Sequence, residues 1–140
     1  MNIRQRPILP SGALVVVAVL ALLACGCGGG SGLDAKALSQ ESSSLQSLAA
    51  EGALLARDSA AGKTTRIFTR VHSNDLYKAA SQSAKSLRTA KTRQALEPKL
   101  RRLASTARKV SADLERLGQA AKDEQRRLAR ELEASAKQLS

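Results

Sequence analysis

His72 is the only imidazole in this chain of 140 residues, and imidazole is the side chain used most often for general acid-base catalysis. Asp75 follows one helical turn later and could orient the ring. A working base also needs a nucleophile or a substrate pocket beside it, and the sequence places neither there. The neighbours Asp123 and Glu124 would point in different directions on a helix, so they make no metal or catalytic pair. We therefore expect a chain that is not an enzyme, with no catalytic residue, no metal site and no cofactor.

The segment from Gly62 to Thr65 reads Gly-Lys-Thr-Thr, like the end of a phosphate-binding loop. Such a loop needs another glycine five positions before Gly62, where Arg57 stands, and it follows a strand. Helical sequence precedes Gly62 instead. We therefore expect an ordinary turn between helices, with a threonine capping the second helix.

The two cysteines, Cys25 and Cys27, are one residue apart, a separation that seldom suits a disulfide. With a single histidine elsewhere, they leave too few ligands for a zinc site. Before them lies an unbroken apolar run of 13 residues, at positions 12–24, which follows Arg4 and Arg6. A membrane-spanning helix needs about 20 apolar residues, so the run fits a secretory signal peptide better than a span.

The apolar run ends in Leu22-Leu23-Ala24-Cys25, which matches the lipobox of bacterial lipoprotein precursors: an aliphatic residue, a tolerant position, a small residue and cysteine. The chain resembles that class. The resemblance implies cleavage before Cys25, a diacylglycerol thioether on its sulfur and an acyl chain such as palmitate on the new N-terminus. The protein would then be exported and lipid-anchored to the extracytoplasmic face of the cell membrane. Lipidation at Cys27, which fits less well, an ordinary cleaved signal and an uncleaved anchor are the alternatives.

Three parts are predicted: a signal peptide at 1–24, a lipidated cysteine with a flexible glycine-rich linker at 25–32, and a helical domain at 33–140. The domain is rich in good helix formers. Its apolar spacing predicts helices at about 34–61, 65–95 and 98–138. Short links between them predict an all-α fold, an up-down-up antiparallel three-helix bundle. In this respect it resembles the small helical bacterial lipoproteins of unknown function.

Apolar stripes along the helices define the expected core. The stripe on the second helix begins with Phe68 and His72, and although Ser73-Asn74 could interrupt this helix, we favour one continuous helix. Leucines keep near-heptad spacing almost to the end of the third helix, so residues 129–140 are expected to project beyond the bundle. Many stripe positions are alanine or serine. The core should therefore be thin, and self-association or a coiled coil is an alternative to a monomer.

Positive charge is concentrated in the middle of this chain of net charge +11, since residues 63–109 carry 13 basic and 2 acidic residues. The topology brings the junction of the second and third helices to the same end as the linker. The basic residues at that junction are Arg88, Lys91, Arg93, Lys99, Arg101 and Arg102. We expect them to contact anionic lipid or an anionic wall polymer, and a merely solvated face is the alternative. Export leaves no nucleic acid as partner, although the charge would suit one.

The start of the second helix is the least generic part of the domain, because it combines aromatic and β-branched residues with arginine. A partner-binding end there would consist of Arg66, Phe68, Arg70 and His72. The alternative, which we favour, is an ordinary helix start that closes the distal end of the core. Arg66 and Arg70 are four residues apart and so share a helix face. We therefore expect a non-enzymatic interaction or structural role at the cell envelope, with a membrane and a protein as partners. The alternative is a carrier or sensor that binds a small ligand between its helices.

Overall fold

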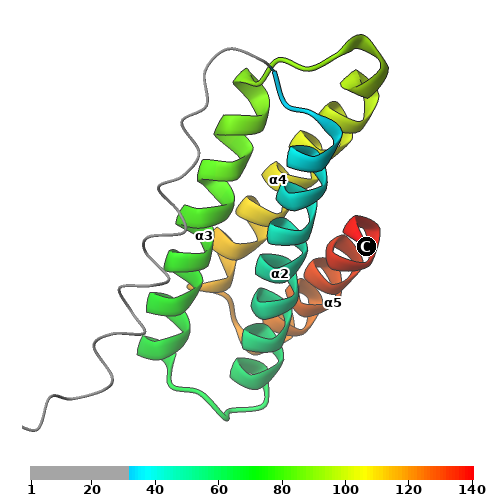
Figure 1. Cartoon of the computed structure of the whole chain (residues 1–140). Helices are drawn as coiled ribbons and strands as arrows, with labels where there is room; N and C mark the ends of the chain where they lie inside the picture. The colour runs from blue at the N-terminus through cyan, green and yellow to red at the C-terminus, as the bar shows by residue number, and fades with distance from the viewer. Residues whose placement is uncertain (1–31) are drawn as a thin grey trace, which may run out of the picture. The chain divides into compact units, whose positions relative to one another are not determined.

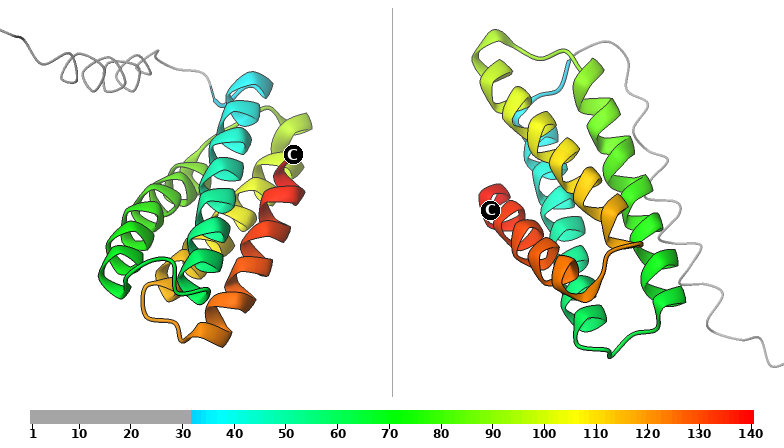
Figure 2. Two further views of the ribbon diagram at one scale, coloured as in Figure 1. Left: turned by 90° about the horizontal axis from the view of Figure 1, so that it is seen from below. Right: turned by 180° about the vertical axis from the view of Figure 1, so that it is seen from behind.

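The computed structural model describes residues 32–140, where Figures 1 and 2 show four helices in antiparallel sequence. Their bounds are Ala35–Ala60 for α2, Arg66–Thr89 for α3, Glu97–Leu117 for α4 and Lys122–Leu139 for α5. A short 3-10 helix, η1 at Gln94–Leu96, leads into α4. The expected all-α class is confirmed. The predicted signal peptide, Cys25 and residues 26–31 of the linker lie outside the described residues.

Local sequence accounts for the first helix boundaries. Asp34 accepts a hydrogen bond from Ala37 N at 2.7 Å and is the N-cap of α2. Thr65 caps α3 in the same way, through Phe68 N at 3.2 Å. Gly62 has a φ of +73°, a left-handed conformation that suits glycine, in the turn between the two helices. The predicted helical turn at Gly62 and threonine cap are therefore confirmed.

The expected three-helix bundle is wrong in its last part, because the predicted helix 98–138 is two helices. α4 ends at Leu117, the chain turns through residues 118–121, and α5 returns to pack against α2 and α4. Residues 129–140 consequently lie within the bundle and do not project beyond it. α2 also packs against α3, and α3 packs against α4, which closes an up-down-up-down arrangement.

Contacts between helices account for the turn after α4, because the residues of the turn itself provide little that would end one helix and begin the next. Gly118 passes so close to α3 that a Cβ there would lie 2.9 Å from Ser73 Oγ. Ala121 precedes α5 with an extended backbone and makes no side-chain cap. Folding back buries Leu128 and Leu132 completely, and each leucine contributes about 1.5–3 kcal/mol on leaving water. Burial of the apolar face of α5 therefore stabilises the folded-back arrangement more than continuation of α4 as one helix, which the leucine spacing predicts.

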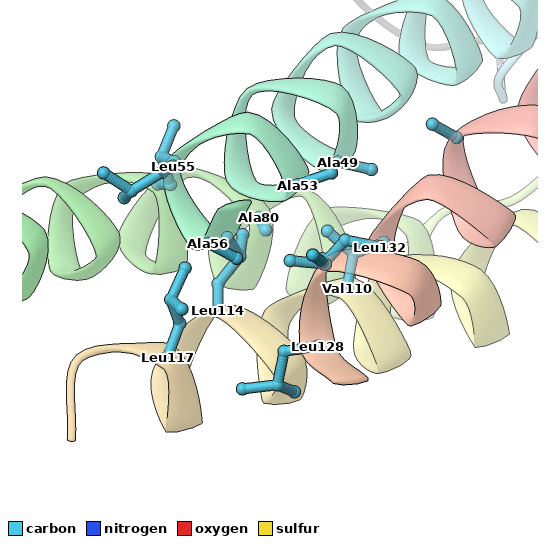
Figure 3. Packing of buried hydrophobic residues seen from close by; sticks show 13 residues of the cluster. Ala49, Ala53, Leu55, Ala56, Ala80, Val110, Leu114, Leu117, Leu128 and Leu132 are labelled. Atoms are coloured by element: carbon cyan, nitrogen blue, oxygen red, sulfur yellow. The ribbon is translucent and has the colours of Figure 1, made fainter. Parts of the chain in front are cut away.

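Two groups of buried leucines, with alanines between them, form the core. The group near the α4–α5 turn, largely visible in Figure 3, includes Leu55, Leu76, Leu114, Leu117, Leu128 and Leu132. The group near the α3–α4 corner includes Leu38, Leu45, Leu87, Leu100 and Leu103. Small residues on α2 set the spacing: a Cβ on Gly52 would lie 2.5 Å from Leu114 Cδ2 and 3.2 Å from Leu132 Cδ1.

α3 is continuous through residues 73–74, as we predicted. The first buried residues of this helix, however, lie one position after those of the predicted apolar stripe. Thr69 and Ser73 are buried there, whereas Phe68 is 52% exposed and His72 is half-buried. Small side chains fit because α3 closely approaches the end of α4, and their hydroxyls find partners: Thr69 Oγ1 lies 3.1 Å from Ser59 Oγ. The prediction that Phe68 belongs to the core stripe is therefore wrong.

Candidate functional site

The six predicted cations lie together on the corner between α3 and α4, at the top of Figure 1. α3 ends at Thr89 and not near 95, since Ala90 and Arg93 have extended backbones that carry the chain around the corner. All six side chains are exposed, and we call this set the basic corner: Arg88, Lys91, Arg93, Lys99, Arg101 and Arg102. Arg101 forms an ion pair with Glu97 at 3.4 Å. Within the described residues, no carboxylate lies within ion-pair distance of the other five.

The beginning of the described chain is bonded to the basic corner. Leu33 N donates to Lys91 O at 2.7 Å, and Thr92 Oγ1 donates to Leu33 O at 2.6 Å. The backbones of Leu33 and Thr92 also form an isolated parallel β-bridge. Gly32 passes so near that a Cβ on it would lie 2.1 Å from Lys91 O. The last glycine of the predicted linker is therefore held against the corner, a contact that the sequence did not reveal.

Charge pairing differs sharply between the two halves of the domain. Of the 13 basic residues at 63–109, four form ion pairs: Lys63, Lys78, Arg101 and Lys109. Of the six at 110–140, four also do so: Arg116, Arg126, Arg127 and Lys137. Nine cations between Arg66 and Arg108 thus lack a carboxylate partner in the described structure. Uncompensated positive charge is a property of α3 and of the first part of α4.

The opposite end of the bundle exposes apolar side chains. Among the described residues, the large apolar side chains that are more than half exposed are Leu54, Ile67, Phe68 and Val71, at 58%, 67%, 52% and 57%. They lie near the end of α2 and at the start of α3, and we call them the apolar end. Arg66 and Arg70 are exposed beside them on α3 and have no ion pair in the described part of the chain. Leu54, Ile67 and Val71 were not among the predicted site residues.

His72 joins this end to α2. Its Nε2 lies 2.8 Å from Glu51 Oε1, and its ring stacks on Phe68 with centroids 5.4 Å apart. Asp75, the residue predicted to orient it, pairs instead with Lys78 at 3.7 Å. Glu51 was missed because its approach depends on the register between α2 and α3, which local spacing does not specify.

The most buried carboxylate lies away from both ends. Asp113 on α4 is 5% exposed and pairs with Lys109 Nζ at 3.1 Å. Burial raises its pKa above the ordinary value, and the hydrogen bond from Lys109 opposes that rise. Glu133 on α5 behaves oppositely, because hydrogen bonds from Lys137 and Arg57 lower its pKa. Asp113 thus pairs within α4, whereas Glu133 links α5 to α2 through Arg57.

No group of three or more histidine, cysteine or acidic side chains at residues 32–140 could hold a metal ion. None of the helices described has the length and apolar character to cross a membrane. Comparison of the chain with models of protein families, with curated proteins and with solved structures found no match.

Proposed function

We propose that the protein is exported, lipidated at Cys25 and held at the cell envelope, where it serves as a non-enzymatic interaction module with its basic corner against an anionic surface. The observation that carries this proposal is the pair of hydrogen bonds in which Leu33 N donates to Lys91 O and Leu33 O accepts from Thr92 Oγ1. They hold Leu33, the residue that directly follows the predicted linker, against the most cationic end of the domain. An anchor seven residues before Gly32 would therefore bring that end to the bilayer.

The length of the linker supports this placement. Seven residues reach at most about 25 Å when fully extended and about 15 Å as a flexible coil. Negative surface potential falls off within a Debye length, about 8 Å at physiological ionic strength. A domain on such a tether samples this layer often, and cations at the tethered end sample it most.

The electrostatic contribution to this contact is moderate. A basic residue close to an anionic surface contributes about 1 kcal/mol, so the five unpaired cations of the basic corner together contribute up to about 5 kcal/mol. Lipid chains already hold the protein at the surface, at about 0.8 kcal/mol for each buried methylene. The charges therefore act mainly on orientation, by favouring the pose in which the corner faces lipid or wall polymer.

Hydrogen exchange on the full, host-processed chain tests the proposal. The protein is placed in nanodiscs of phosphatidylglycerol or of phosphatidylcholine, so that only the lipid charge differs. We expect slower exchange at residues 90–93 in the anionic discs, and loss of that difference when Arg88, Lys91 and Arg93 are changed to glutamine. The matched control neutralises Arg126, Arg127 and Arg130 on α5 and should keep the difference. Equal exchange in both discs would refute the orienting role.

Intact mass tests the anchor separately. Protein from a lipoprotein-processing host should begin at Cys25 and carry diacylglycerol. Cys25→Ser should abolish the added mass, whereas Cys27→Ser should leave it unchanged. An unprocessed start, or lipid on Cys27, would overturn the assignment of Cys25.

The apolar end is the part of the domain that a protein partner would contact, and its flanking Arg66 and Arg70 favour a partner with acidic side chains around an apolar centre. A second copy is disfavoured, because symmetric pairing would place these arginines against their own copies. A lipid surface is disfavoured as well, because α2 is 26 residues long and so holds this end about 39 Å from the tethered end.

A photo-crosslinking residue at Val71 tests this surface. We expect an adduct with an acidic protein segment, whose yield falls when Arg66 and Arg70 are changed to glutamate. The same crosslinker at the exposed Gln82 serves as the control. Adducts with lipid or with a second copy alone would overturn the partner that we propose.

The alternative function, a carrier or sensor that binds a small ligand between its helices, would be favoured by an internal cavity lined by alanine and leucine. Two hollows on the described residues, of about 620 Å³ beside α3 and α4 and of about 450 Å³ between α2, α4 and α5, are lined mainly by hydroxyl, amide and charged side chains. A third, of about 460 Å³, is lined by three alanines and three arginines of α2 and α5 and the turn after α2. These linings support an interaction role over the carrier or sensor.

A further inference from the structure

A hollow of about 230 Å³ lies between α3 and α4, next to the basic corner. Three cations from the two helices line it: Lys85 and Arg88 on α3, and Arg108 on α4. None of the three has a carboxylate within ion-pair distance in the part of the chain that the structure describes. The other polar side chains of the lining are Tyr77, Ser81, Ser111 and Glu115.

The three cations outnumber the one carboxylate in the lining, Glu115, and none of them forms an ion pair with it. Lys85 and Arg88 are three residues apart, so they are neighbours on the surface of α3. Because α3 and α4 are antiparallel, Arg108 faces them across the hollow. Like charges held together in this way repel one another, and an anion bound among them would relieve that repulsion.

The chemistry of the lining suits a phosphate group. Arginine guanidinium groups match phosphate oxygens in paired hydrogen bonds, and the ammonium of Lys85 adds a point charge. Ser81 and Ser111 add hydroxyl donors. The volume is below the range of about 300–1,000 Å³ typical of pockets for drug-sized ligands, so it suits a single small anionic group.

We infer that this hollow binds one phosphate group, either free or as the headgroup of a lipid or polymer. Glu115 marks its far limit, because it lies seven residues along α4 from Arg108, or about 10 Å. The inference goes beyond the proposed function: a basic corner attracts any anionic surface, whereas the hollow would select a phosphate group with defined neighbours. It does not depend on the lipid at Cys25.

Titration of the full chain in neutral maltoside detergent tests the site. Inorganic phosphate and glycerol 3-phosphate are added at constant ionic strength, with chloride as the reference anion, and amide chemical shifts are recorded. We expect saturable shifts confined to residues 77–88 and 108–115. Arg88→Gln with Arg108→Gln should weaken binding at least about tenfold. Glu115→Gln should strengthen phosphate binding, because it removes a negative charge that repels the phosphate.

The control carries the same loss of charge elsewhere, in Arg66→Gln with Arg130→Gln, neither of which lines this hollow. It should bind phosphate as the parent chain does. Shifts spread over all exposed cations, with equal losses in both double variants, would overturn the site and leave the orienting role of the basic corner intact.

Nanodiscs distinguish the source of the phosphate. If the headgroup of a lipid is the ligand, phosphatidylglycerol discs should protect residues 77–88 from exchange in the parent and in the control, but not in the hollow variant. If the ligand is soluble, the maltoside titration alone should show the site. Failure of both probes would refute the inference, and it would say nothing against lipidation at Cys25, which intact mass tests independently.

Discussion

Replacing Gly32 with alanine should release the linker from the basic corner. A Cβ at this position would lie 2.1 Å from Lys91 O, 2.5 Å from Lys91 C and 3.0 Å from Thr92 N. All three are backbone atoms, so no side-chain rotation relieves the overlap. The backbone around Gly32 has to move, and the two hydrogen bonds of Leu33 are lost with that movement.

The magnitude follows from those two bonds. Each intramolecular hydrogen bond contributes about 0.5–1.5 kcal/mol, so docking of the linker weakens by about 1–3 kcal/mol. Hydrogen exchange at the Leu33 amide should then speed up by a factor of between about 5 and 150. The urea midpoint for global unfolding should hardly change, because the docked segment precedes α2 and opens locally.

Two substitutions at Thr92 calibrate the measurement. Thr92→Val removes the bond from Thr92 Oγ1 to Leu33 O and leaves the bond to Lys91 O, so it should give about half the effect. Thr92→Ser keeps a hydroxyl and should resemble the parent. Unchanged protection of the Leu33 amide in Gly32→Ala would show that the linker is not docked in solution. The main support for the proposed orientation of the domain would then be gone.

Three further predictions concern packing and pH. Leu128→Ala should cost about 2–5 kcal/mol in urea unfolding, because the side chain is fully buried; a loss below about 0.5 kcal/mol would mean that α5 does not fold back. Gly52→Ala should lose about 1 kcal/mol net, since overpacking against Leu114 costs about 1–3 kcal/mol and helix propensity returns about 1; a more stable variant would contradict the close approach. Folding raises the pKa of Asp113, so the contribution of this carboxyl to stability falls as the pH rises above 3.8. Folding lowers the pKa of Glu133, so the contribution of Glu133 is lost as the pH falls below 4.5. Relative to the parent between pH 3 and 7, Asp113→Asn should therefore gain stability with rising pH and Glu133→Gln should lose it; profiles of the same sign would refute one assignment.

Features that depend on near neighbours in the sequence were predictable. The cap at Thr65, the left-handed turn at Gly62 and the proline at the start of α4 each depend on contacts within a few residues. The all-α class follows from the same kind of signal. The six cations of the basic corner were found because charge density along the chain and antiparallel order are both readable from sequence.

The features that could not be predicted from the sequence depend on contacts between helices. The stripe of leucines passes through residues 117–128 with near-heptad spacing, and Gly118 alone did not signal a turn. Phe68 was assigned to the core by its apolar character, yet Thr69 and Ser73 occupy the narrow contact of α3 with its neighbours. The bond between Leu33 and Lys91 joins residues far apart in sequence, and no local pattern announces it.

The turn at residue 118 also explains why the domain has two electrostatic halves. Because α5 returns along α2 and α4, its carboxylates reach those helices, as in the ion pairs of Glu133 with Arg57 and of Glu124 with Arg116. The principal packing partners of α3 are α2 and α4, so α5 leaves the cations of α3 uncompensated. In one long helix, the acidic residues at 123–133 would lie beyond the bundle, and Arg57 and Arg116 would lose these partners. The fold-back therefore concentrates the unpaired positive charge on α3 and the first part of α4, where the basic corner and the phosphate hollow lie.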